Sequence, residues 1–204
     1  SKAIGHVRYS TTGEPALRNV QPLFADFKFG GLSIAHNGNL TNAVRCRHEL
    51  VQRGCLFQST SDTEIIVHLI AISLYSTVVD RLIDALRQVE GAYSLVAMTQ
   101  KKLIGVRDPR GVRPLVLGKL DNAYILASET CALDIIDAEF VRDIEPGELI
   151  VIDDDGLHSY KPSPPVRKRL CIFEYIYFAR PDSDVDGTNV YEARKAIGAE
   201  LARE

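Results

Sequence analysis

The sequence has little that marks membrane, secreted or nucleic-acid-binding proteins. No apolar run is long enough to span a bilayer, and no charged-then-apolar signal segment opens the chain. Neither sign of charge is in large excess, because 24 basic and 27 acidic residues give a formal charge of -3. We therefore expect no nucleic acid and no membrane as partners, and the cytoplasm as the location.

Cysteine is scarce, and its spacing is uninformative. The four cysteines, Cys46, Cys55, Cys131 and Cys171, include no C-x-x-C pair, which argues against a disulfide framework or a self-contained zinc site. Gly-rich phosphate loops and internal repeats are also absent. The composition, 46% hydrophobic and 25% charged over 204 residues, is that of a globular protein with one to one and a half domains.

Strands and helices alternate in the first half of the chain. Apolar patterning predicts strands over residues 3–10 and 31–35. One helix is predicted after Asn42, and another begins at Ser61-x-x-Glu64, which has the form of a capping box. A third helix follows them.

The second half, from Ala92, is mostly β. Short β-rich segments predict a series of strands, with one short helix over 130–136. The Asp-Gly of "DDDG" could belong to a cation site, but it is more typical of a hairpin turn. Helices followed by many strands favour an α+β fold, with helices packed on mainly antiparallel sheets. Three prolines and four basic residues in "KPSPPVRKR" indicate a domain boundary near residues 161–169.

Asn37-Gly38 is a strong hairpin signal, yet only one of its flanks is a strand. The residues before it read as a buried strand, and those after it read as a helix. An asparagine NH₂ group and a nearby backbone N–H, with glycine allowing close approach, can instead form an oxyanion hole.

Other polar clusters complete an amino-acid site. Arg8 could hold an α-carboxylate, and Asp62, at a helix N-terminus, could hold an α-ammonium. Each of these clusters also has an ordinary explanation. Arg8 could be a solvated charge, and Asp62 could complement the helix dipole. The arginine-rich "DPRG", a further polar cluster, could be a type I turn. A nucleophile activated by a base is missing from this set.

Six motifs together carry a resemblance: "GHVRYSTTG", "AHNGNLTN", "STSDTE", "DPRGVRPL", "ASETCALD" and "YIYFARPDSDVDGTNVYEAR". In this order they resemble the glutamine phosphoribosylpyrophosphate amidotransferase (amidophosphoribosyltransferase) family of purine biosynthesis. The first three are shared more loosely with other glutamine amidotransferases of the N-terminal-nucleophile class. The last three single out the purine enzyme.

The resemblance implies a four-layer αββα glutaminase domain followed by a type I phosphoribosyltransferase domain. We expect residues 1–163 to be the glutaminase part and 164–204 the linker and the start of the second domain. By resemblance, Arg8 holds the glutamine carboxylate, Asp62 holds its ammonium, and Asn37 and Gly38 form the oxyanion hole. Tyr9 and Thr11 lie in the same substrate-binding stretch, and Tyr9 couples it to the other domain.

The chain departs from the family at both ends. The family's nucleophilic cysteine lies well upstream of "GHVRYST", and none of the four cysteines can replace it. Ser1 is rejected as an N-terminal nucleophile because it lies in the middle of the expected domain. The phosphoribosylpyrophosphate loop and its Mg²⁺ site are expected beyond Glu204. We therefore expect this piece to be inactive alone and the full-length protein, by resemblance a homotetramer using glutamine and phosphoribosylpyrophosphate, to be active.

Cys171 has two interpretations. One subgroup of the family has a cysteine at this place that binds a [4Fe–4S] cluster, which needs four thiolates. The other three would lie beyond this sequence, and a structural thiol is the alternative.

Two other functions remain open at this point. The chain could belong to another class II glutamine amidotransferase with a different second domain. It could also be a non-catalytic domain that binds glutamine as a sensor. The missing nucleophile would favour the sensor only in a complete chain.

Overall fold

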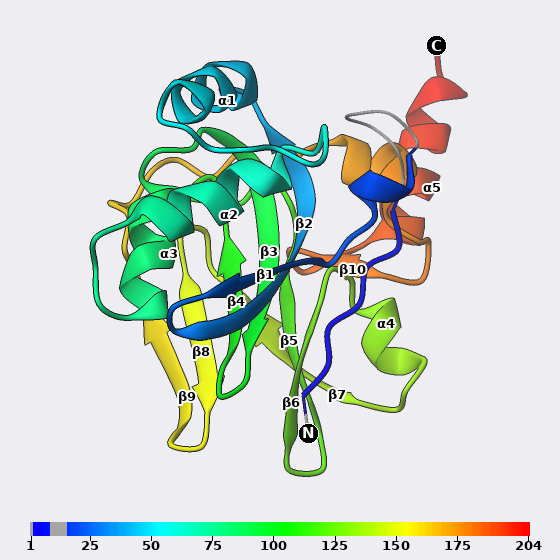
Figure 1. Cartoon of the computed structure of the whole chain (residues 1–204). Coiled ribbons are helices and arrows are strands. Elements are labelled where there is room, and N and C mark those ends of the chain that lie inside the picture. Colours follow the sequence, from blue (N-terminus) through cyan, green and yellow to red (C-terminus); the bar gives the residue numbers. More distant parts are fainter. Residues whose placement is uncertain (1, 9–15) are drawn as a thin grey trace.

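The computed structural model describes residues 2–8 and 16–204. Their helices and strands, drawn in Figure 1, follow in chain order. They are η1 (Leu17–Asn19), β1 (Leu23–Phe27), β2 (Gly30–Leu40), α1 (Ala43–Gln52), α2 (Thr63–Ile72), α3 (Val78–Leu86), β3 (Gly91–Thr99), β4 (Leu103–Arg107), β5 (Val116–Leu120), β6 (Ala123–Ala127), α4 (Cys131–Asp134), β7 (Glu139–Asp143), β8 (Leu149–Asp153), β9 (Gly156–Tyr160), η2 (Glu174–Phe178), β10 (Asp184–Val185), β11 (Thr188–Asn189) and α5 (Val190–Leu201). None of the helices in these two ranges is long and apolar enough to cross a membrane.

The strands form two main sheets with antiparallel neighbours. The first has six strands in the order β1-β2-β3-β4-β8-β9, and the second has three in the order β6-β5-β7. A two-residue pair, β10-β11, lies outside both. The antiparallel arrangement expected from the sequence is confirmed. The "DDDG" segment joins β8 to β9 as the predicted hairpin.

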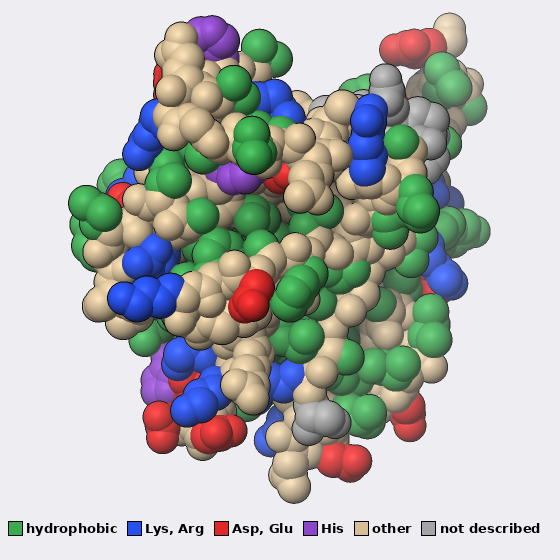
Figure 2. All heavy atoms as spheres, viewed as in Figure 1, with side chains coloured by type: hydrophobic (Ala, Val, Ile, Leu, Met, Phe, Trp, Pro, Cys, Tyr) green, Lys and Arg blue, Asp and Glu red, His purple; other side chains and the backbone are tan. Residues whose placement is uncertain are grey.

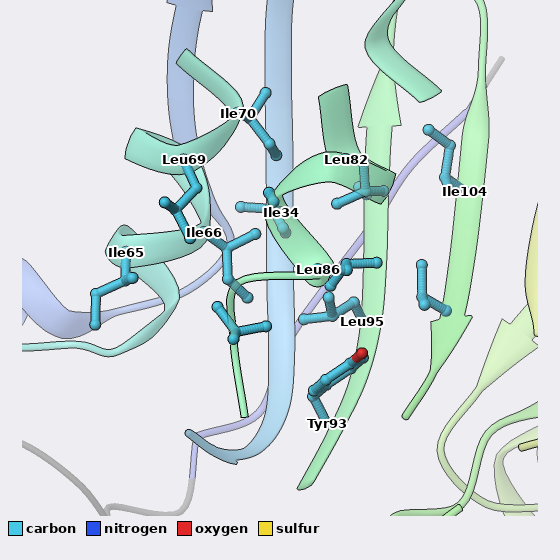
Figure 3. Close-up of a cluster of buried hydrophobic side chains, with 14 of the residues drawn as sticks. Ile34, Ile65, Ile66, Leu69, Ile70, Leu82, Leu86, Tyr93, Leu95 and Ile104 are labelled. Atoms are coloured by element: carbon cyan, nitrogen blue, oxygen red, sulfur yellow. The ribbon is translucent and has the colours of Figure 1, made fainter. Parts of the chain in front are cut away.

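The main core lies between α1–α3 and the six-stranded sheet (Figure 3). In α2, Ile65, Ile66, Leu69 and Ile70 have the spacing of one helix face, and all four are buried. They pack against the sheet face that includes Ile34. Each fully buried Ile or Leu side chain contributes about 1.5–3 kcal/mol, so this layer dominates the stability of the fold.

Alternation along the strands builds the remaining layers. Leu149 of β8 faces the helices, whereas its neighbour Ile150 belongs to a second core with Leu117 of β5, between the two sheets. On the outer side of the second sheet, Val116 packs against Leu133 of α4. The order helix, sheet, sheet, helix confirms the expected αββα sandwich.

Three sequence predictions about elements were wrong. Residues 3–8 form no strand in the structure. The strand predicted over 31–35 extends to Leu40, because register with β3 continues from Leu32↔Thr99 to Leu40↔Gly91. The predicted capping box does not form: the Glu64 carboxylate accepts from the Ser59 N–H and hydroxyl rather than from Ser61.

The chain after residue 160 builds a separate small cluster. Residues 161–171 have no regular structure, and Ala179, Val185 and Val190 form their own buried group. Apolar side chains recur along the right-hand edge in Figure 2, where Figure 1 places α4 and α5. The domain boundary near 161–169 stays a prediction.

Candidate active site

Asn37 and Gly38 lie inside β2, not at its end as the sequence suggested. In register they face Ser94 and Tyr93 of β3. The Thr41 N–H donates to the Glu90 carbonyl, so the alternation of an antiparallel ladder makes Asn37↔Ser94 a hydrogen-bonded pair. In the next pair, Gly38↔Tyr93, the N–H of Gly38 points away from β3.

The edge to which the Gly38 N–H points is left open by β1, whose pairing with β2 ends at Leu23↔Ile34. Two neighbouring amides on this edge have side-chain partners. The His36 N–H donates to Gln21 Oε1 at 2.7 Å, and the Leu40 N–H donates to Asp62 Oδ2 at 2.9 Å. The Gly38 amide lies between them, directed at the space that these side chains frame.

Glycine at position 38 is required by close approach. A Cβ there would lie 2.1 Å from the Ala92 carbonyl oxygen and 2.8 Å from His36 Nε2, at a φ of +151°. Any side chain would therefore push β2 away from β3 and would clash with the His36 ring. The strand holds the Gly38 backbone closer to its neighbours than another residue could.

The Asn37 side chain is oriented by two contacts. Its Oδ1 accepts from Arg113 Nη2 at 2.8 Å, and its Nδ2 donates to Ser128 Oγ at 3.2 Å. Because the NH₂ group has two hydrogens, Ser128 leaves one for another acceptor. A hydrogen-bond donor on a side chain and one on the backbone thus lie on neighbouring residues of β2.

Asp62 lies at the N-terminus of α2, as the sequence predicted, and it is the N-cap residue there, but its side chain does not cap that helix. Instead it accepts from Leu40 N–H and lies 3.5 Å from His36 Nδ1. Burial raises the pKa of Asp62, yet His36 and the Leu40 N–H stabilise the anion more, and the pKa lies below its usual value. The side chain is buried and ionised at neutral pH, as a partner for an ammonium group must be.

A cavity of 790 Å³ brings the predicted residues together. Arg8, Asn37, Gly38 and Asp62 all line it, although they come from three separate parts of the first 62 residues. Its volume is within the range of sites for small molecules. Tyr9 and Thr11, also predicted for this site, lie outside the described residues.

The sequence offered a type I turn for the arginine-rich "DPRG", and the structure shows a turn there, closed by the Gly111 N–H and the Asp108 carbonyl and built around the buried Asp108 carboxylate. Asp108 accepts from the N–H groups of Arg110, Val112 and Arg113. Burial raises the pKa of Asp108, and these N–H groups oppose that rise. The turn holds Arg113 at the wall of the cavity, opposite Asn37.

Several residues of the site were not singled out from the sequence. His36 and Gln21 organise the β2 edge, Ser128 and Arg113 hold Asn37, and Glu174 pairs with Arg113 at 2.6 Å. Burial raises the pKa of Glu174 to about 7, against the pull of Arg113. An acid within the aromatic stretch "FEYIYF" was the one available signal for Glu174.

Metal ligation is limited to one candidate. Across residues 2–8 and 16–204, no group of three or more His, Cys, Asp or Glu side chains could hold a metal. Cys171 lines the cavity, half-buried and as a free thiol. One thiolate does not make a [4Fe–4S] site, so the described residues do not by themselves fit this cluster.

A protein-family model described as "Glutamine amidotransferase domain" matches residues 6–134. This part of the chain includes the four predicted site residues that line the cavity. The chain belongs to this glutamine amidotransferase family. Amidophosphoribosyltransferase of Rhizobium etli is 58% identical over 209 residues, covering 100% of this chain and 42% of the relative. A chloroplastic amidophosphoribosyltransferase 2 of Arabidopsis thaliana is 49% identical, covering 99% of this chain and 36% of the relative.

A solved structure agrees with this assignment. Glutamine phosphoribosylpyrophosphate amidotransferase from B. subtilis, in complex with ADP and GMP, matches with a TM-score of 0.92 and 44% identity. The match covers 98% of this chain and 43% of that one. The expected class II amidotransferase fold is confirmed. The chain spans about two-fifths of the length of the relatives it matches.

Proposed function

We propose that the full-length protein is an amidophosphoribosyltransferase. It hydrolyses glutamine to glutamate and transfers the released ammonia to phosphoribosylpyrophosphate, which gives 5-phosphoribosylamine and pyrophosphate. The family assignment and the relatives' names support this proposal. The observation that carries it is one cavity lined by a carboxylate-binding cation, an ammonium-binding anion and two hydrogen-bond donors.

The four predicted cavity residues bind different groups of the glutamine molecule. Arg8 binds the α-carboxylate as a cation, and Asp62 binds the α-ammonium as a buried anion. Asn37 Nδ2 and the Gly38 N–H donate to the oxygen of the tetrahedral intermediate, where negative charge develops. By the same resemblance, Tyr9 and Thr11 contribute to the substrate-binding stretch, and Tyr9 couples it to the second domain.

The nucleophile of the proposed reaction is a cysteine outside this sequence, with its own α-amine as the base. The 204-residue piece alone is therefore expected to be inactive in both half-reactions. Incubation of this piece with glutamine tests that expectation, because measurable release of glutamate would mean that a residue of this chain is the nucleophile.

The oxyanion role is tested with Asn37→Ala in the full-length protein. The rate of glutamate release should fall by about two to three orders of magnitude, because removal of one oxyanion-hole donor has an effect of this size in other enzymes. Synthesis of 5-phosphoribosylamine from added ammonia should persist, because it bypasses glutamine hydrolysis. Unchanged glutamate release would remove Asn37 from the reaction.

By the same resemblance, we also propose a Mg²⁺ site in the phosphoribosyltransferase domain, a homotetramer and a cytoplasmic location. Cys171 is proposed as one ligand of a [4Fe–4S] cluster whose other ligands lie beyond this sequence. Iron and sulfide analysis of the full-length protein decides between that role and a structural thiol.

A further inference from the structure

We propose that Arg113 is a positioning residue for the Asn37 amide, and that η2 holds Arg113 in place through Glu174 and Phe178. This inference rests on the proposed function, since it concerns the hydrolysis of glutamine. It adds a role for the "DPRGVRPL" turn and for the segment after the linker.

Arg113 determines which way the Asn37 amide faces. An asparagine side chain has an acceptor oxygen and a donor NH₂ at nearly the same positions, and rotation by half a turn exchanges them. A guanidinium can only donate. The atom that faces Arg113 Nη2 at 2.8 Å must therefore be Oδ1, which directs the NH₂ group to the Ser128 side.

This orientation decides whether Asn37 can serve an oxyanion. The reversed amide would present its oxygen where negative charge develops and would repel it. Arg113 excludes that orientation, because the Asn37 NH₂ group would then face the N–H donors of the guanidinium. The positive charge of Arg113 beside Oδ1 also polarises the Asn37 amide, which makes its NH₂ group a stronger donor.

The backbone of Arg113 is fixed on both sides. The Asp108 carboxylate accepts from the Arg113 N–H, and the Arg113 carbonyl accepts from the buried Arg107 Nε at 2.8 Å. The next carbonyl, of Pro114, accepts from Ser94 Oγ at 2.9 Å. Ser94 is the register partner of Asn37, so one strand pair anchors both residues.

The side chain of Arg113 is held by η2. Glu174 Oε1 lies 2.6 Å from Arg113 Nη1, and the Phe178 ring centre lies 4.9 Å from Arg113 Cζ. The Glu174 side chain is only 2% exposed and that of Arg113 is 17% exposed, so solvent does not compete well for this pair. The orientation of Asn37 in the glutaminase part therefore depends on residues that follow the linker.

The test uses steady-state kinetics of the full-length protein with Arg113→Ala, Asn37→Ala and the double variant. Arg113→Ala should lower kcat for glutamate release by about 10- to 100-fold, less than loss of the donor itself. KM for glutamine should change by no more than about twofold, since ground-state binding is untouched. Ammonia-dependent synthesis should persist, and the double variant should be no slower than Asn37→Ala, because Arg113 acts through Asn37.

Two further variants complete the experiment. Arg110→Ala is the matched control, since Arg110 is an exposed arginine of the same turn, and it should leave both activities unchanged. Arg113→Lys keeps a charged donor and should recover part of the lost kcat. If Arg113→Ala also loses ammonia-dependent synthesis, Arg113→Met, which keeps the length without the donors, replaces it.

Three outcomes would overturn the inference while leaving the proposed function in place. They are an unchanged kcat in Arg113→Ala, a raised KM with an unchanged kcat, which would mean direct substrate binding, and losses that multiply in the double variant. An inert Asn37→Ala would instead show that the oxyanion role itself is wrong. The two failures are thus distinguishable.

Discussion

At the scale of single residues, Gly38 is where one added methyl group has the largest expected effect. The Cβ of Gly38→Ala would lie 2.1 Å from the Ala92 carbonyl oxygen, so β2 must shift. We expect the free energy of unfolding to fall by about 1–3 kcal/mol, as for other overpacked sites. Urea denaturation of the full-length protein measures this, and glutamate release should fall with it.

The matched control for Gly38→Ala is Gly198→Ala in α5. A Cβ at Gly198 would meet no atom within 4 Å. Alanine is the better helix former, so this change should be neutral or stabilise by about 0.5–1 kcal/mol. Equal stability of the two variants would contradict the close-approach explanation for Gly38.

The sequence was informative about residues whose chemistry matches a ligand. An amino acid presents a carboxylate and an ammonium, so Arg8 and Asp62 could be chosen by charge, and the cavity brings them together. The Arg113 contact could not be predicted in this way, because it joins residues 76 positions apart and no local pattern reports it. Glu174 is more distant still.

At the scale of elements, Glu148 ties the two sheets together. It pairs with Arg142 of β7 at 2.7 Å, and its Oε1 accepts from Ser159 of β9 at 2.7 Å. The carboxylate is buried, whereas the Arg142 side chain is 38% exposed, which moderates the strength of the pair. We expect Glu148→Gln to lower the free energy of unfolding at pH 7 by about 1–3 kcal/mol.

The pH dependence gives this prediction a second readout. Burial raises the pKa of Glu148, but the Arg142 and Ser159 bonds outweigh it and bring the pKa below its usual 4.5. The stabilisation from the ionised carboxylate is thus present above pH 4.5 and is lost as pH falls through the folded-state pKa. Unfolding curves of wild type and Glu148→Gln should be separated by a constant amount at neutral pH and converge in acid. A separation that is the same at every pH would contradict an ionic role.

Element boundaries were predicted well where the apolar period was strong and poorly where long-range pairing decides. The face of α2 and the strands after Ala92 follow local patterns, and both are observed. The continuation of β2 through Asn37 and Gly38 depends on β3, more than 50 residues later, so the polar "HNGN" was interpreted as the end of a strand. Residues 3–8 have strand-like composition but no strand partner among the described residues.

At the scale of the whole molecule, two motifs that are far apart in the sequence meet. Glu129 and Thr130, just before α4, accept hydrogen bonds from residues 180–184, the turn that leads into β10. The alternation of apolar residues in the sequence could predict the layers of the fold. It could predict neither the order of the strands nor the contact between these two motifs. The contact matters because it fixes the segment that contains η2, and η2 holds Arg113.

Glu129→Ala tests this attachment. Glu129 Oε2 accepts from the Arg180 N–H and the Ser183 hydroxyl, each at 2.8 Å, and the variant loses both bonds. Hydrogen bonds to a charged group contribute about 1.5–3 kcal/mol, so local opening of residues 172–190 should become roughly 10- to 100-fold more frequent. Hydrogen exchange of the full-length protein measures this, with β3 as the internal reference.

Glu139→Ala, at an exposed glutamate of β7, should leave exchange unchanged. Because freer η2 residues no longer hold Arg113, glutamate release should fall in Glu129→Ala as well. Wild-type exchange rates over 172–190 in Glu129→Ala would mean that the segment is held by its other contacts.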